Sequence, residues 1–107
     1  MKLGVILSSI NAETNWNAFR LTNLAVRKGD DVSVFLIGEG VGDGKNSSER
    51  FNIKKQVDKL LQSEKAKLLA CGTCLDIRHK KSTKACQIGG IEDLYALVSD
   101  SDKVLTF

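Results

Sequence analysis

Apolar residues along the chain form short continuous runs that are separated by segments with helical spacing. The runs at residues 2–9 and 31–38 are nearly unbroken, as is typical of strands buried on both faces of a parallel sheet. Two more runs, at residues 66–72 and 103–107, predict strands of the same kind, and a shorter strand is expected at residues 84–88. The pattern therefore predicts five strands with helices between them.

Two of the intervening segments have the periodicity of amphipathic helices. Residues 14–28 predict a helix that ends at Gly29, because apolar positions recur there at helical spacing on one face. These positions are Ala18, Leu21, Thr22 and Ala25. A second helix is predicted to begin after Asn52, whose side chain is well placed as an N-cap. Its inward face comprises Ile53, Val57, Leu60 and Leu61.

The cysteine segment and the C-terminal part predict two further helices. A short polar helix is expected to begin at Thr73 and to carry Cys74 in its first turn. Gly89 and Gly90 open the last helix, where acidic residues follow at the positive end of the helix dipole. The apolar positions that share one face of this helix are Ile91, Leu94, Tyr95 and Val98.

This order of elements predicts an α/β fold, a three-layer α/β/α sandwich with a mostly parallel five-stranded sheet in a single domain spanning residues 1–107. With 42% hydrophobic residues, a chain of 107 residues can bury a core without metals or disulfides. Ligands of such folds bind at the carboxyl ends of the strands. The loops at residues 8–15, 38–51 and 71–81 are therefore the candidate site.

Charge and hydropathy narrow the functional classes. The net charge is +3, only 6% of residues are aromatic, and no basic stretch alternates with aromatics, so we expect no nucleic-acid binding. The apolar run near the start is too short for a signal peptide or a bilayer span, and we expect a cytoplasmic protein without membrane contact. In a reducing compartment, the three cysteines are expected to be thiols, ligands or redox groups before structural disulfides.

The strongest chemical signal is CGTCLDIRHKK at residues 71–81, where a predicted strand ends and a helix begins. Free backbone N–H groups at the helix start, with Arg78 one turn beyond Cys74, favour thiolate over thiol, while Asp76 opposes this. Cys71 would be held at the mouth of the site. In the competing interpretation, Cys71 and especially Cys86 are small apolar core residues.

Metal binding and dithiol redox chemistry would each use the same cysteines. Zinc would need Cys71, Cys74, His79 and Cys86, but only the first two have a metal-knuckle spacing, and we expect no metal or cofactor. The CGTC sequence also suggests a thioredoxin-like dithiol. The chain has no proline to supply the cis-proline of that fold, which leaves a dithiol mechanism on another scaffold.

Two polar loops are less specific. The glycines at positions 38, 40, 42 and 44 match no phosphate-binding motif, and Glu39 and Asp43 would repel a phosphate. A loop that covers the site or joins an interface is the favoured interpretation. Residues 11–16 either line a pocket or combine a helix cap with a packed tryptophan.

The chain resembles the DsrE/DsrF-like proteins, and most closely the YchN-like group within them. The resemblance rests on SSINAETNWNAFRLTNLAV, VSVFLIGEGV, FNIKKQVDKLL, LLACGTCLDIR and SDKVLTF. It implies a DsrEFH-like, flavodoxin-like fold. In sulfur-relay members, including TusD-like subunits, a cysteine after the third strand carries sulfur as a persulfide, and Cys71 matches it. Cys74 matches the second cysteine of the YchN-like group, and His79 follows Arg78 where the family often has glycine.

The resemblance implies a small sulfur carrier, sulfurtransferase-like if it acts as an enzyme, with Cys71, Cys74 and Arg78 as its site residues. Sulfur donor and acceptor proteins would be its partners, and relatives that form dimers, trimers and hexamers imply a homo-oligomer. Two different functions stay open: an oligomeric ligand-binding or assembly module with structural thiols, and a CxxC dithiol redox protein.

Overall fold

The computed structural model describes residues 1–42, 46–82 and 86–107, and the strands in this part of the chain form one five-stranded sheet. The strands are β1 (Lys2–Leu7), β2 (Asp31–Leu36), β3 (Ala66–Cys71), β4 (Gln87–Gly89) and β5 (Lys103–Thr106). Their order is β4-β3-β2-β1-β5 and every neighbouring pair is parallel. The predicted α/β fold is confirmed, with a sheet that is parallel throughout. Residues 84 and 85 of the predicted fourth strand lie outside the described residues.

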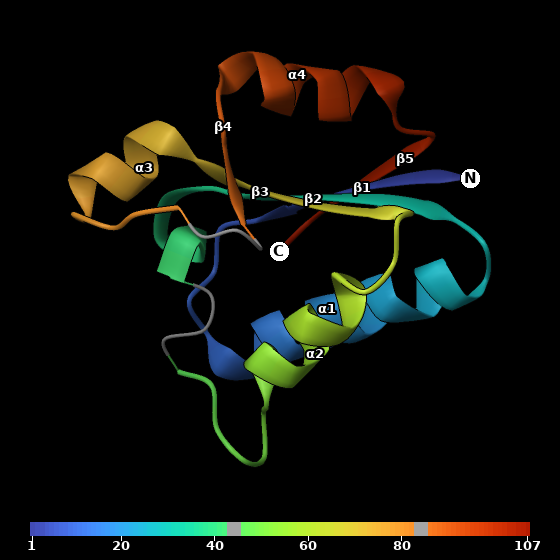
Figure 1. Cartoon of the computed structure of the whole chain (residues 1–107), viewed down its shortest axis with the longest axis horizontal. Coiled ribbons are helices and arrows are strands. Elements are labelled where there is room, and N and C mark those ends of the chain that lie inside the picture. Colours follow the sequence, from blue (N-terminus) through green and yellow to red (C-terminus); the bar gives the residue numbers. More distant parts are fainter. Residues whose placement is uncertain (43–45, 83–85) are drawn as a thin grey trace.

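The helices cover both faces of this sheet (Figure 1). Helices α1 (Ala12–Arg27) and α2 (Ile53–Leu60) lie on one face and α4 (Ile91–Asp100) lies on the other. Helix α3 (Gly72–Ile77) and the 3-10 helix η1 (Gly38–Gly42) follow the carboxyl ends of β3 and β2. None of the helices in the described residues is long and apolar enough to cross a bilayer.

The main core lies between the sheet and the layer of α1 and α2. Alternate residues of β1 and β2 point into it, as the two-residue period of a strand requires. They meet the buried side chains of Phe19, Ile53 and Leu60. The predicted N-cap of α2 is confirmed, because Asn52 Oδ1 accepts a hydrogen bond from the backbone N–H of Lys55 at 3.0 Å.

Helix α1 departs from the prediction at Leu21, which the hydropathy pattern assigns to the inward face but which is 39% exposed. The buried arc of α1 also includes Asn15 and Asn23, which are not among the positions predicted for that face. Asn15 donates to the carbonyl oxygen of Ser9 at 2.9 Å, and Asn23 donates to the carbonyl oxygen of Gln56 at 3.0 Å. These hydrogen bonds give partners to both buried amide nitrogens, whereas Asn15 Oδ1 is buried without a partner among the described residues.

The apolar face that the sequence indicates for α4 points largely outward. Ile91 and Tyr95 are 77% and 73% exposed and Val98 is 49% exposed, whereas Leu97 is buried. The cause is Gly4 of β1, where an added Cβ would lie 2.6 Å from both Leu97 Cδ2 and Ser101 Oγ. Because glycine leaves this space free, the helix rests on its Leu97 side and its apolar stripe faces outward.

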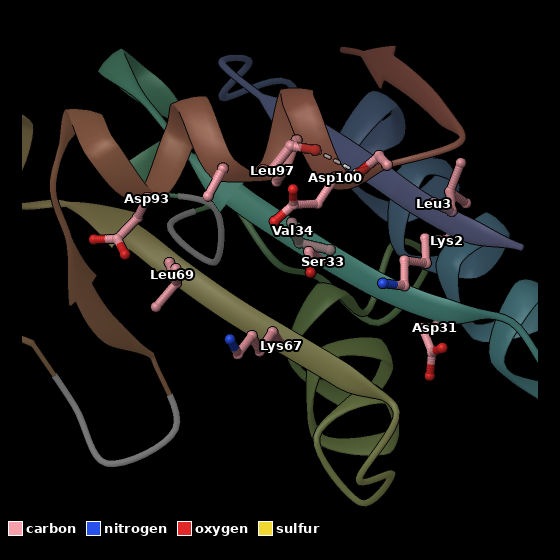
Figure 2. A pocket seen from close by; sticks show the side chains of 12 residues that line it. Lys2, Leu3, Asp31, Ser33, Val34, Lys67, Leu69, Asp93, Leu97 and Asp100 are labelled. Atoms are coloured by element: carbon pink, nitrogen blue, oxygen red, sulfur yellow. Dashed lines mark hydrogen bonds between the residues drawn. The ribbon is translucent and has the colours of Figure 1, made fainter.

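Part of the α4 face of the sheet stays open beside the helix. A cavity of about 270 Å³ lies between α4 and the strands β1 to β3, and Figure 2 shows the side chains that line it. Its charged lining residues are Lys2, Asp31, Lys67, Asp93 and Asp100. Unlike the opposite face, which two helices cover, this face has an uncovered strip that includes Ser33 and Leu69.

Candidate functional site

The two cysteines of the CGTC segment lie in one turn at the carboxyl end of β3. Cys71 is the last residue of the strand and the N-cap of α3, and Cys74 lies in the first turn of the helix. Gly72 makes the tight transition possible, because a Cβ there would lie 2.9 Å from Ile88 Cγ2. The structure thus brings together the two thiols that the sequence singled out, and both are half-buried.

The surroundings of Cys71 favour its thiolate. Partial burial is the largest influence and raises its pKa, but the backbone N–H and the thiol of Cys74 and the backbone N–H of Thr73 donate hydrogen bonds to the sulfur. Together these bonds outweigh the loss of solvation, so the pKa of Cys71 lies below its ordinary value. This site therefore supports a nucleophilic sulfur.

Cys74 receives a hydrogen bond from a distant segment. The backbone N–H of Gly38, at the start of η1, donates to Cys74 Sγ at 3.2 Å. Gly38 has a φ of +58°, a left-handed conformation that glycine adopts readily. Sequence reasoning missed this group, since a backbone N–H has no signature in residue type.

The glycine-rich segment packs closely at the ends of the strands. An added Cβ at Gly40 would collide with the carbonyl oxygen of Leu7, and one at Gly42 would lie 3.3 Å from Lys80 Nζ and 3.5 Å from Ile10 Cδ1. The three candidate loops therefore meet, as predicted, at the carboxyl edge of the sheet. Residues 38–42 are helical where an irregular loop was predicted, and Asp43 and Gly44 lie outside the described residues.

Arg78 supports the turn that holds both thiols. Its Nη1 donates to the carbonyl oxygen of Cys74 at 3.2 Å, which gives a partner to a carbonyl near the end of α3. The groups that shift the pKa of Cys71 belong to Thr73 and Cys74. Arg78 is thus close to the dithiol turn, but its hydrogen bond is to the backbone.

His79 occupies the position after the C-cap where helices often have glycine. Its φ is +53°, and its N–H donates to the carbonyl oxygen of Asp76 at 3.1 Å. The N–H of Lys80 donates to the carbonyl oxygen of Leu75 at 2.9 Å, which completes a Schellman motif. The exposed imidazole therefore sits on a backbone conformation that costs energy for a residue with a Cβ.

Cys86 is not part of the turn that carries the other two cysteines. It packs against the core cluster on the α2 side and lines a cavity of about 290 Å³ together with Leu36, Leu75 and Lys80. The zinc set considered from the sequence is not assembled, because no three His, Cys, Asp or Glu side chains within residues 1–42, 46–82 and 86–107 are grouped to hold a metal ion.

In the first loop, capping and packing account for the polar residues. Asn11 is the N-cap of α1, and its Oδ1 accepts from the N–H of Thr14 at 3.0 Å. The ring of Trp16 contacts that of Phe51 edge-on, with centroids 5.4 Å apart, and the Arg20 guanidinium lies 4.3 Å above its centroid.

Comparisons with known proteins agree with this geometry. The chain is 27% identical to an uncharacterised protein of Methanocaldococcus jannaschii, with both chains fully covered. It is 28% identical to an uncharacterised protein of Methanopyrus kandleri, over 89% of this chain and 83% of that one. The crystal structure of the YchN protein from E. coli is similar over the full length of both chains, with a TM-score of 0.79 and 26% identity. The sequence matches the DsrE/DsrF-like family over residues 1–107, and the chain therefore belongs to that family.

Proposed function

We propose that the protein is a sulfur carrier that holds a sulfane sulfur as a persulfide on Cys71. Membership of the DsrE/DsrF-like family suggests a sulfur-relay-related role. The observation that carries the proposal is the position of Cys71 at the carboxyl end of β3, where it is the half-buried N-cap of α3 and Cys74 lies in the first turn of that helix. The backbone N–H groups of Thr73 and Cys74 and the Cys74 thiol lower the pKa of Cys71, which favours the thiolate before transfer.

In the loading step, the Cys71 thiolate attacks the outer sulfur of a donor persulfide. A new S–S bond forms on Cys71, the S–S bond of the donor breaks, and the donor leaves as a thiolate. Unloading is the same reaction with an acceptor thiolate as the nucleophile, and it returns Cys71 to the thiolate form. No external oxidant or reductant is needed, since one S–S bond replaces another and the transferred sulfur keeps its oxidation state.

The persulfide on Cys71 can also react with Cys74 instead of an acceptor protein. The Cys74 thiolate can attack the inner sulfur of the Cys71 persulfide, which forms a Cys71–Cys74 disulfide and releases hydrosulfide. The contact between the two side chains brings both sulfurs together for this step, and the N–H of Gly38 donates a hydrogen bond to Cys74 Sγ. The same contact supports the second candidate function, a dithiol that cycles through a disulfide. Arg78 keeps the turn in shape through its bond to the Cys74 carbonyl.

Mass spectrometry after incubation with a persulfide donor tests the proposal. We expect an increment of about 32 Da, one sulfur atom, on the peptide that contains Cys71. Cys71→Ser should abolish it, Cys74→Ser should make it longer-lived, and the control Cys86→Ser should leave it unchanged. An alkylatable Cys71 that never gains sulfur would contradict the carrier proposal, and reversible disulfide formation without loading would favour the dithiol function.

A further inference from the structure

The layer opposite α4 carries an excess of basic over acidic side chains. Helices α1 and α2 carry five basic and two acidic side chains, so that their net charge of +3 equals that of the whole chain. The basic ones are Arg20, Arg27, Lys54, Lys55 and Lys59. Helix α4 has three acidic residues and no basic one. The layer of α1 and α2 is therefore positively charged, whereas α4 is acidic.

A groove runs along this surface between the two helices. Its cavity measures about 410 Å³, and its eight lining residues are Asn17, Arg20, Leu21, Asn23, Leu24, Arg27, Gln56 and Lys59. Leu21 and Leu24 are 39% and 41% exposed and lie in sequence between the two arginines. Apolar and cationic side chains thus share one groove without any carboxylate in its lining.

The cations of the groove are available to a ligand. The one ion pair within the described residues joins the N-terminal amine to Asp30, so Arg20, Arg27 and Lys59 form none there. Arg20 is held in place by Asn17, to which it donates at 3.1 Å, and by stacking on Trp16. The bond from Asn23 to Gln56 joins the two walls of the groove.

We propose that this groove binds an acidic amphipathic helix of a partner protein. Arg20 and Arg27 lie seven residues apart, about 10.5 Å along the axis of α1, which is too far for one small anion to contact both. Carboxylates two turns apart on a docked helix match this spacing, and apolar residues between them would cover Leu21 and Leu24. Lys59, on the opposite wall, would bind a third carboxylate.

Other polyanions fit the groove less well. Single-stranded nucleic acid needs aromatic rings for base stacking, but Arg20 already covers Trp16. An anionic membrane would be bound by protruding apolar groups, whereas the two leucines lie among longer cationic side chains in the groove lining. The groove lies on the α1 and α2 layer, away from the α4 side toward which β3 points Lys67 and Leu69, so a bound partner leaves Cys71 accessible.

Trp16 is the sole tryptophan of the chain and stacks on a groove residue, so its emission can report binding. The probe is a helical peptide of about 15 residues, four turns, with leucines on one face and glutamates flanking them two turns apart. We expect saturable binding that weakens as salt rises. Arg27→Glu with Lys59→Glu should weaken it about tenfold or more. The control Lys54→Glu with Lys55→Glu changes the charge equally outside the groove and should bind as well as the wild type.

Several results would overturn the proposal. Equal binding of a peptide with lysine in place of glutamate would exclude charge recognition, and equal weakening by the control pair would exclude the groove. A single-stranded oligonucleotide or anionic vesicles that bind through Arg27 and Lys59 when the peptide does not would assign the groove to those ligands. A change in Trp16 emission with protein concentration alone, abolished by the groove variant, would assign it to a second copy. Sulfur loading of Cys71 is independent of each result.

Discussion

The sulfur of Cys71 differs from an ordinary thiol because two backbone N–H groups and the Cys74 thiol donate to it. Its pKa in the folded chain is lower than in the unfolded chain, where about 8.5 is usual. The thiolate therefore contributes to stability above the unfolded pKa, and this contribution is lost as the pH falls through the folded pKa. The same shift makes the sulfur nucleophilic at a lower pH than a free cysteine.

The rate of Cys71 alkylation should accordingly rise with a midpoint below a pH of about 8.5. Cys74→Ala removes one donor and should move the midpoint upward, while Cys86→Ala should not move it. Iodoacetamide labelling at a series of pH values, read by peptide mass spectrometry, measures both. A wild-type midpoint at or above that of a free thiol would show that burial dominates.

His79 offers a residue-scale test of stability. Its left-handed backbone costs about 1 kcal/mol or more for a residue with a Cβ, and glycine removes that cost. His79→Gly should therefore raise the free energy of unfolding by up to about 1 kcal/mol, measured by urea denaturation. His79→Ala keeps the Cβ and should leave stability nearly unchanged. A glycine variant less stable than the wild type would show that the His79 side chain contributes more to stability than its backbone conformation costs.

At the scale of elements, η1 couples the end of β1 to the dithiol turn. Gly40 packs against the Leu7 carbonyl, and Gly38 of the same short helix donates to Cys74 Sγ. A side chain at Gly40 must displace the backbone of η1, and the Gly38 N–H would move with it. This coupling joins three segments that are remote in sequence.

Gly40→Ala should destabilise the fold by roughly 1–3 kcal/mol, because the added methyl collides with backbone. It should also change the alkylation rate of Cys74. Gly42→Ala is the matched control, since its nearest neighbour is the flexible end of Lys80 and a small shift relieves the contact. Thermal unfolding and thiol labelling compare the two variants. If the two variants are equally stable, the shift of η1 that relieves the Gly40 collision costs no measurable free energy.

For the whole molecule, the asymmetry of the two sheet faces is the main feature. Parallel sheets are normally covered on both faces, yet a strip beside α4 is open (Figure 2). The adjoining stripe of Ile91, Tyr95 and Val98 is exposed. A second copy of the chain packed on this face would cover both the open strip and the exposed stripe. We propose that the implied homo-oligomer forms through this face.

Sedimentation should then show assemblies larger than a monomer, and Tyr95→Glu should shift them toward monomers by placing a charge in the apolar contact. Leu24→Glu puts the same charge on an exposed leucine of the opposite layer and should not change the assembly. A wild-type chain that stays monomeric over a wide concentration range would contradict this proposal.

Features that depend on contacts between residues close in sequence were predicted more accurately than features that depend on remote contacts. The strands, the Asn52 cap and the placement of Cys71 and Cys74 in one turn depend on neighbours within a few residues, and these predictions are confirmed. The outward turn of Leu21 was mispredicted because buried asparagines are invisible to hydropathy. The sequence pattern did not predict which side of α4 rests on the sheet, because that depends on Gly4, nearly a hundred residues away.

Local spacing and hydropathy were thus enough to predict the order of strands and helices along the chain. They also placed two thiols at the carboxyl end of β3, since neighbouring residues carry that information. The Gly38 donor to Cys74, the groove around Leu21 and the exposed stripe of α4 depend on how remote segments pack. Periodicity reports which face of an element is apolar, but it does not report which partner that face meets, and packing against that partner sets the final orientation.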